Sequence, residues 1–144
     1  MLTQAEADAL IAMEKRFIQV LPVTLHPGKN QTFELSGYPD TKERFFLDLW
    51  RGSIKLTKYR FQNRGRKVVI LVRLELNAAP HTNPDGTRIG GTHIHVYREG
   101  YDDKWAVAVS PDHFRNVSSL RQTFDDFCQY CNISEQPPFQ EELV

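Results

Sequence analysis

Two histidines, His93 and His95, stand two positions apart in the segment Thr92–Glu99, where polar and apolar residues alternate. In a β-strand this alternation places the apolar side chains on the core side and both imidazoles on the other side, about 7 Å apart. Tyr97 and Glu99 have the same parity and are expected on the imidazole face. Neighbouring imidazoles can supply general acid–base catalysis near neutral pH, or they can bind a metal ion.

A second strand, expected over Lys67–Leu76, can enlarge this group. If it pairs with the histidine strand, Arg73 and Glu75 join the same face. The long loop Asn77–Gly91 contains Asn-Pro-Asp-Gly, which is strong turn chemistry. It would bring three more polar residues to the strand ends: His81, Asp85 and Arg88.

One chemistry that these groups can perform is RNA cleavage without a metal ion. It requires an acid and a base for the reacting oxygens and cations for the negative charge of the phosphorane. The predicted acid–base residues are His81, His93 and His95. Arg73, Arg88 and Tyr97 are predicted to stabilise or position the phosphate. In architecture and residue types, this layout resembles small bacterial endoribonuclease toxins, which makes the comparison an analogy.

A competing hypothesis is a metal site. The motif His93-x-His95-x3-Glu99 resembles the first metal motif of the cupins, in which two imidazoles and a carboxylate hold a divalent metal such as Zn, Mn or Fe. The resemblance is partial, because Ala106 stands where the family has a glycine. A second motif with a later histidine at the end of a strand is also missing, since His113 lies between Pro111 and a predicted helix.

The stretch from Arg51 to Arg73 carries eight basic residues and no acidic one. Such a block attracts phosphates or an acidic partner, although charge along a strand pair also protects it from edge pairing. The residues predicted to hold an RNA backbone are Lys55, Lys58, Arg60, Arg64 and Arg66. The same hairpin, 51–73, supports a third hypothesis, that the protein is not an enzyme and binds an acidic partner through this hairpin. Examples are a phage-encoded inhibitor and a protein that binds an antitoxin.

The elements expected to position these residues define an α+β fold with a helix at each end of a single antiparallel sheet of about five strands. The first helix is predicted over Leu2–Leu21, with Thr3 and Glu6 as a capping box. The second is predicted from about Leu120 to Cys131, capped by Ser118 or Ser119. Strands are expected over 31–35, which is weak, and over 44–50, 54–62 with a bulge near Lys58, 67–76, 92–99 and 104–109.

Composition bounds the remaining questions. We expect one domain, residues 1–131, followed by an extended or disordered tail, residues 132–144. Cys128 and Cys131 fall on an apolar helical stripe, which predicts core packing instead of a metal half-site or a redox pair. The longest apolar run, Val68–Val72, is too short to cross a bilayer, and the N-terminus lacks the pattern of a signal peptide. A cytoplasmic protein without membrane contact is therefore predicted, and a homodimer is compatible with the sequence.

Several motifs together are similar to a family of small, uncharacterised bacterial proteins of prophages and mobile elements. They are Trp50-Arg-Gly-Ser-Ile-Lys-Leu-Thr-Lys-Tyr, Gln62-Asn-Arg-Gly-Arg, His81-Thr-Asn-Pro-Asp-Gly, His93-Ile-His-Val-Tyr-Arg-Glu-Gly, Lys104-Trp-Ala and Phe127-Cys-Gln-Tyr-Cys-Asn-Ile. The resemblance covers most of the chain. It implies a mobile-element setting, where toxin–antitoxin and phage-defence genes are common, and it assigns no activity and no catalytic residue.

Overall fold

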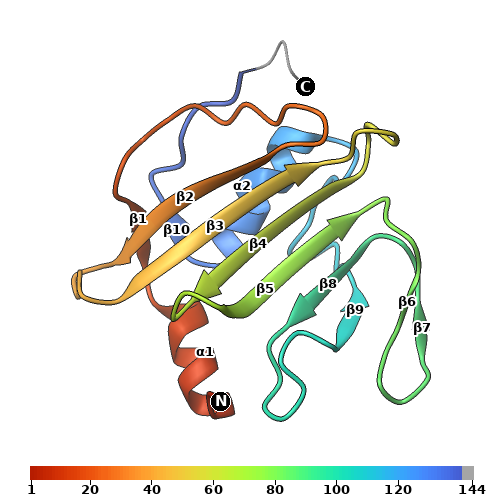
Figure 1. Ribbon diagram of the computed structural model, residues 1–144, viewed down its shortest axis with the longest axis horizontal. Helices are drawn as coiled ribbons and strands as arrows, with labels where there is room; N and C mark the ends of the chain where they lie inside the picture. Colours follow the sequence, from red (N-terminus) through yellow and green to blue (C-terminus); the bar gives the residue numbers. More distant parts are fainter. Residues whose placement is uncertain (141–144) are drawn as a thin grey trace.

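The predicted α+β class is confirmed in a computed structural model that describes residues 1–140 (Figure 1). The described residues form one eight-stranded sheet in the order β10-β1-β2-β3-β4-β5-β8-β9, in which only the β10–β1 pair is parallel. The strands are β1 (Lys15–Phe17), β2 (Asn30–Gly37), β3 (Arg44–Arg51), β4 (Tyr59–Gly65), β5 (Val69–Leu76), β8 (His93–Val96), β9 (Ala106–Ala108) and β10 (Ile133–Ser134). A separate hairpin comprises β6 (His81–Thr82) and β7 (Arg88–Ile89). The sheet is wider than predicted, because β1 and β10 are too short to show an alternation in the sequence.

The N-terminal helix α1 (Gln4–Ala12) is about half as long as predicted. Its start is confirmed, since Thr3 and Glu6 form the capping box. Its end is a correction, because the backbone turns extended at Met13 and the chain continues as β1 instead of remaining helical to Leu21. The apolar residues beyond β1 that suggested a longer helix include Ile18, which is 48% exposed.

Lys15 is the physical reason for this early end. Its side chain is fully buried, and its ammonium donates to the backbone oxygens of Ile11 (2.9 Å), Met13 (2.9 Å) and Cys131 (2.7 Å). The ammonium also lies 4.8 Å from the centre of the Phe45 ring. A single cation thus satisfies carbonyl groups at the C-terminal ends of both helices, where the helix dipole favours positive charge.

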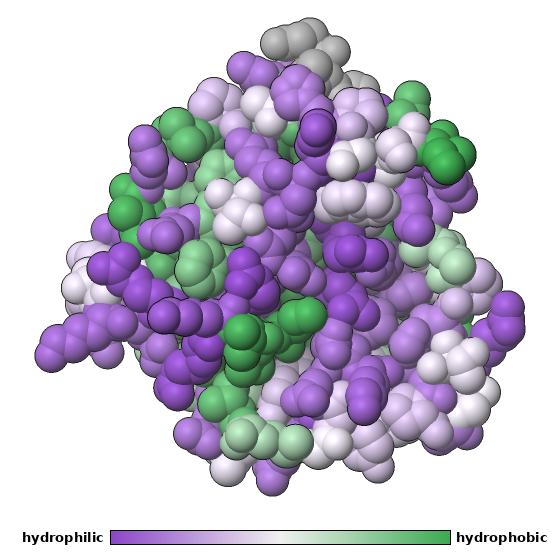
Figure 2. Space-filling model, in the orientation of Figure 1, coloured by the Kyte–Doolittle hydropathy of each residue, from purple (hydrophilic) through white to green (hydrophobic). Residues whose placement is uncertain are grey.

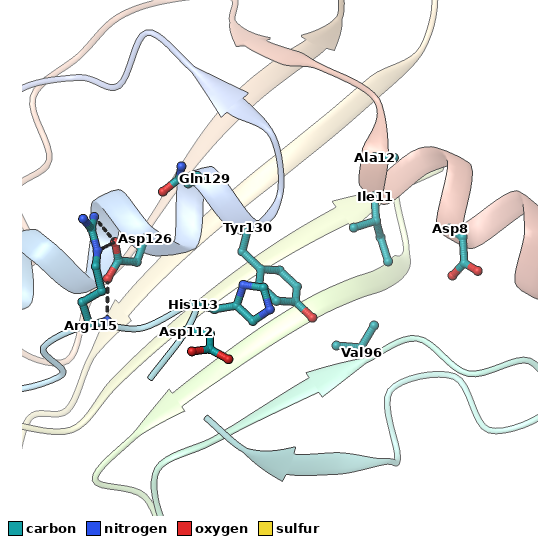
Figure 3. Close-up of a pocket in the computed structure, with 10 residues that line it drawn as sticks. All are labelled: Asp8, Ile11, Ala12, Val96, Asp112, His113, Arg115, Asp126, Gln129 and Tyr130. Atoms are coloured by element: carbon teal, nitrogen blue, oxygen red, sulfur yellow. Dashed lines mark hydrogen bonds and ion pairs between the residues drawn. The ribbon is translucent and has the colours of Figure 1, made fainter. Parts of the chain in front are cut away.

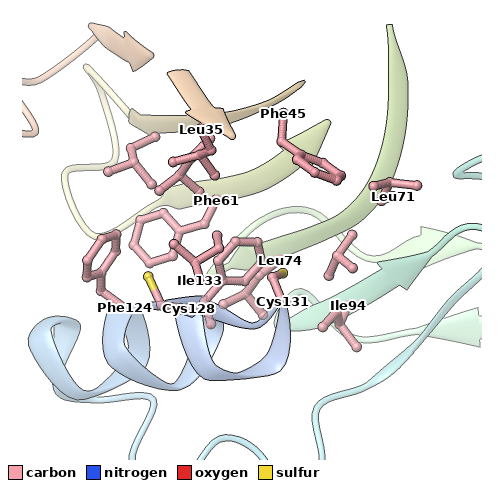
Figure 4. Close-up of a cluster of buried hydrophobic side chains, with 14 of the residues drawn as sticks. Leu35, Phe45, Phe61, Leu71, Leu74, Ile94, Phe124, Cys128, Cys131 and Ile133 are labelled. Atoms are coloured by element: carbon pink, nitrogen blue, oxygen red, sulfur yellow. The ribbon is translucent and has the colours of Figure 1, made fainter. Parts of the chain in front are cut away.

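The C-terminal helix α2 (Leu120–Tyr130) matches its prediction and starts at the N-cap Ser119. It packs on one face of the sheet and encloses the main core (Figure 4). Cys128 and Cys131 are both free and fully buried there, which confirms the predicted core packing. Around them lie aromatic and aliphatic side chains from both layers: Leu35, Phe45, Phe61, Leu71, Leu74, Ile94, Phe124 and Ile133.

The central strands pair with one irregularity. In β4 and β5, Asn63 pairs with Val72 and Arg64 with Ile70, so Leu71 is an extra residue in β5. The predicted bulge near Lys58 is therefore misplaced, because residues 52–58 form a loop and β4 begins only at Tyr59. The extra residue changes the parity of β5, so that Leu71 joins the core instead of the face that carries Arg73.

The segment after α2 is extended and docked as far as the structure describes it. β10 pairs with β1, and Phe139 forms a bridge with Val23. Of the two alternatives predicted for the tail 132–144, the extended one is therefore found over 132–140. Residues 141–144 lie outside the described part of the chain.

The other face of the sheet is not covered by α2, which lies behind the strands in Figure 1. The space-filling view from the same side shows a mainly hydrophilic surface (Figure 2). Side chains of β3, β4, β5 and β8 meet on this polar face in register. One cross-strand row is formed by Trp50, Arg60, Glu75 and His93, and the next by Asp48, Gln62, Arg73 and His95.

Candidate functional site

Three of the predicted residues, His81, His93 and His95, form one imidazole cluster. The ring centres are 4.6 Å apart for His81 and His95, 5.0 Å for His93 and His95, and 5.7 Å for His81 and His93. The predicted pairing of β5 with β8 is confirmed, with Glu75 opposite His93 and Arg73 opposite His95. The sheet therefore positions two imidazoles, a guanidinium and a carboxylate, and the β6–β7 hairpin adds the third imidazole.

The hairpin is fixed to the sheet by Asn83, which is buried. Its side-chain amide donates to the carbonyl of Ala106 (2.9 Å) and accepts from the N–H of the same residue (2.8 Å). The base of the hairpin is tight at Gly91, where a Cβ would lie 2.1 Å from the Ala78 oxygen. These contacts hold His81 against the two histidines of β8.

Each imidazole donates one N–H to a backbone carbonyl. The pairs are His93 Nδ1 with Gly90 O (2.6 Å), His95 Nδ1 with Asp103 O (2.7 Å), and His81 Nε2 with Lys104 O (2.8 Å). Because a carbonyl can only accept, these three nitrogens carry protons. The second nitrogen of each ring is then the one that can exchange a proton or bind a ligand.

Arg73 links the cluster to two carboxylates. Its Nη2 lies 3.3 Å from His95 Nε2, its Nη1 pairs with Asp103, and its Nε lies 3.3 Å from Glu75 Oε1. Burial, and then the Arg73 charge, lower the pKa of His95 from 6.5 to about 4. His95 is consequently neutral at physiological pH, and its Nε2 lone pair accepts from Arg73.

This arrangement bears on the metal hypothesis. A metal ligand needs a free lone pair, and that of His95 faces a cation instead of an open position. Within residues 1–140, no group of three or more histidine, cysteine, aspartate or glutamate side chains is arranged to hold a metal ion. Glu99, the predicted third ligand, lies elsewhere, because its carboxylate accepts from the backbone N–H of Gln4 at 2.7 Å.

The positions predicted for Tyr97 and Glu99 are thus wrong. β8 ends at Val96, opposite the irregularity in β5, and the Tyr97 N–H donates to the Leu71 oxygen. The extra residue in β5 disturbs the alternation there, and Tyr97 turns into the core, where its hydroxyl donates to Leu2 O at 2.6 Å. Tyr97 is 2% exposed and cannot position a phosphate beside the histidines.

Arg88 also lies away from the cluster. In the β6–β7 pair, His81 stands opposite Ile89 and Thr82 opposite Arg88. Adjacent residues of a strand point to opposite sides, so the exposed Arg88 projects from the face of the hairpin that does not carry His81. The structure therefore brings together His81, His93, His95 and Arg73, but not Arg88 or Tyr97.

The predicted phosphate-binding cations are spread along β4 and its flanking turns. Lys55 is exposed in the 52–58 loop, and the Lys58 ammonium lies 5.6 Å from the Trp50 ring centre. The three arginines are ion-paired with carboxylates of neighbouring segments: Arg60 with Glu75, Arg64 with Asp48, and Arg66 with Glu43. Much of the local positive charge is therefore neutralised in the folded protein.

A concave region lies on the helix side of the sheet (Figure 3). This cavity of about 600 Å³ is bounded by α1, α2, β8 and the segment before α2. His113 packs against the Tyr130 ring there, with centres 5.2 Å apart, and Arg115 pairs with Asp126 at 2.7 Å. None of the predicted site residues lines it. The imidazole cluster on the polar face is therefore the place where the predicted site residues meet.

Sequence reasoning missed residues that shape the site through the backbone or from a distance. Asp103 lies in a turn and contacts His95 through its carbonyl and Arg73 through its carboxylate. Asn83 is part of a turn motif and gives no sign that its amide is buried. Glu75 was expected on this face, but the single residue offered no signal for its environment.

The pKa of His95 leads to a stability prediction. Between pH 6.5 and about 4 the unfolded chain binds a proton at His95 that the folded chain excludes. The free energy of unfolding should therefore fall by about 3 kcal/mol as the pH drops through this window. In His95→Gln the free energy of unfolding should depend less on pH over this window, as measured by urea unfolding at a series of pH values. His113→Gln, an exposed histidine, is the matched control, and equal slopes in wild type and His95→Gln would contradict the assignment.

The fold and the site define an α+β protein with imidazole and guanidinium groups on the open face of an antiparallel sheet. The chain matches a family described as "Family of unknown function (DUF6978)" over residues 2–133, and it belongs to that family. No curated protein and no solved structure gives a match. No helix among the described residues is long and apolar enough to cross a membrane.

Proposed function

We propose that this protein targets nucleic acid as a metal-independent endoribonuclease, acting as the toxin of a toxin–antitoxin or phage-defence module. The observation that carries the proposal is the convergence of three imidazoles and the Arg73 guanidinium on the sheet face opposite α2. Imidazole provides proton transfer at neutral pH, and a fixed guanidinium stabilises a phosphorane oxygen. Two free, buried cysteines are compatible with the reducing cytoplasm as its compartment.

The three imidazoles have different roles in this proposal. His95 stays neutral and contacts Arg73, so it is a positioning residue for the guanidinium. His81 is only partly buried, whereas His93 and His95 are 3% and 2% exposed. His81 is therefore the imidazole that a substrate reaches first, and His93 lies behind it. We assign the proton transfer to this pair.

The position of Arg73 favours this chemistry over metal-assisted chemistry. A divalent ion beside His95 Nε2 would be repelled by a guanidinium at 3.3 Å. In the proposed site the guanidinium, which is also paired with Asp103 and Glu75, supplies N–H donors to the phosphate oxygen that a metal would otherwise coordinate. The protein itself then supplies both the cation, Arg73, and the groups that transfer protons.

The experiment is cleavage of end-labelled single-stranded RNA by purified protein, with and without EDTA. We expect equal rates in both conditions, with products that end in a 2′,3′-cyclic phosphate, and growth arrest on induced expression that a neighbouring gene relieves. Loss of cleavage in EDTA and recovery with Zn, Mn or Fe would overturn metal independence and favour a metal site that includes His93 and His95. Absence of cleavage under both conditions would overturn the endoribonuclease.

A second candidate is a non-enzymatic interaction protein, and one observation favours it. The loop between β3 and β4 presents Ile54, 98% exposed, and Leu56, 47% exposed, beside the exposed Lys55. Apolar side chains next to a cation suit an acidic protein partner. Growth arrest without RNA cleavage, together with a stable complex with the product of a neighbouring gene, would favour this candidate.

A further inference from the structure

One oxygen of the site has no partner. Glu75 is 6% exposed, and its Oε1 accepts from Arg60 Nε at 2.9 Å and lies 3.3 Å from Arg73 Nε. Its Oε2 is buried and has no hydrogen-bond partner within residues 1–140. Buried carboxylate oxygens are normally hydrogen-bonded, because an unpaired one costs free energy. Oε2 is therefore an acceptor of the candidate site that still lacks a donor.

The location of Glu75 indicates which kind of donor that is. Glu75 stands directly opposite His93 in the β5–β8 register, and Arg73, on the same face of β5, contacts His95. A carboxylate, an imidazole and a guanidinium are therefore adjacent on two paired strands. A substrate phosphate beside Arg73 would place its neighbouring sugar near Glu75 or near the histidines.

We propose that Glu75 is the catalytic base of the site and that its Oε2 accepts the proton of the substrate's 2′-hydroxyl, so that the protein acts on RNA and not on DNA. This inference rests on the proposed function and adds to it the residue that takes the proton of the attacking 2′-hydroxyl. The 2′-hydroxyl is the group by which a protein distinguishes the two nucleic acids at a given position. A carboxylate is a pure acceptor, which suits a hydroxyl donor.

The reaction balances within the site. Glu75 Oε2 takes the 2′-hydroxyl proton while the 2′ oxygen attacks phosphorus, and a protonated imidazole of the His81–His93 pair gives its proton to the leaving 5′ oxygen as the P–O5′ bond breaks. The products are a 2′,3′-cyclic phosphate and a 5′-hydroxyl. Arg73 stabilises the charge on the phosphorane, and Arg60 holds Oε1 so that Oε2 remains free.

The division of labour follows from the contacts. The Nε2 lone pair of His95 is engaged by Arg73, so His95 cannot serve as the base without breaking that contact. The imidazole pair is left as the acid, and the free carboxylate oxygen as the base. A deoxy strand lacks both the nucleophile and the hydroxyl that would pair with Oε2.

The experiment compares wild type, Glu75→Gln and Asp48→Asn on one single-stranded RNA and on the same strand with a single 2′-deoxy position at the cleaved bond. Asp48 is the matched control, since it is a buried carboxylate on the same sheet face, ion-paired with Arg64, and both of its oxygens have partners. We expect kcat of Glu75→Gln to fall by about 10²–10⁴-fold with little change in KM.

Asp48→Asn, compared at equal folded fraction by circular dichroism, should retain the activity and pH profile of wild type. The strand with one deoxy position should be left intact by wild type and should bind more weakly than the RNA. Unchanged kcat in Glu75→Gln would overturn the inference while the proposed function stands, and would leave Oε2 as the site of a structural water. A wild-type protein that cleaves no RNA would overturn both.

Discussion

His81→Ala and His93→Gln should each reduce the rate of RNA cleavage by about 10²–10⁴-fold, the usual cost of removing a general acid or base. Both imidazoles donate one N–H to a backbone carbonyl and keep the other nitrogen for proton transfer. For the partly buried His81 alanine is tolerable, whereas glutamine at the buried His93 replaces the imidazole by a polar amide that cannot act as a general acid or base. Single-turnover cleavage at a series of pH values is the measurement, and wild type should show a bell-shaped profile.

His113→Ala is the matched control for these variants. It removes an exposed imidazole on the helix side of the sheet, beside the cavity in Figure 3, and should leave the rate unchanged. Folding of each variant is verified by its urea midpoint. Full activity in His81→Ala and His93→Gln would remove β8 from the chemistry, and the interaction protein would then be the leading hypothesis.

Lys15→Met should lower the free energy of unfolding by about 3 kcal/mol. Three backbone oxygens lose a charged donor, at about 1.5–3 kcal/mol for each bond. An opposing gain arises because burial lowers the pKa of Lys15 from 10.5 to about 8, so the ammonium itself is costly to bury. Removing the buried charge should therefore return about 3 kcal/mol of stability. The lost bonds outweigh it.

Urea unfolding at pH 7 measures this effect, and Lys42→Met is the control, because Lys42 is exposed. The Lys42 variant should stay within about 0.5 kcal/mol of wild type. A Lys15→Met variant as stable as wild type would contradict this expectation. It would show that hydrogen bonds from water replace those of the ammonium at the carbonyls of the two helix ends without loss of stability.

The site was predictable where it depends on strand parity. His93 and His95 lie on one face because residues two apart in a strand do so, and Arg73 and Glu75 join them because β5 pairs with β8 as expected. The same rule failed at Tyr97, directly after the end of β8, because the extra residue in β5 lies opposite that end. An irregularity in one strand cannot be recognised in the alternation of its neighbour.

The basic segment illustrates a different limit. In the sequence, the arginines of β4 have no acidic residue near them, yet their carboxylate partners lie on adjacent strands, at Asp48 and Glu75. Charge neutralisation of this kind depends on the register between strands, which cannot be read from the number of basic and acidic residues in one segment. Likewise, Lys15 looks like a surface residue of a helix until the third carbonyl, 116 positions away at Cys131, completes its environment.

The contact between Asn83 and Ala106 has a consequence for how this sheet meets other chains. β9 is the last strand of the sheet, and both backbone groups of Ala106 point away from β8 to the Asn83 amide. An exposed strand edge is a template on which foreign strands add and from which aggregates grow. Here the Asn83 side-chain amide already pairs with the donor and the acceptor that an incoming strand would need at Ala106. The same contact that holds the hairpin of the candidate site therefore blocks the addition of a foreign strand at this position.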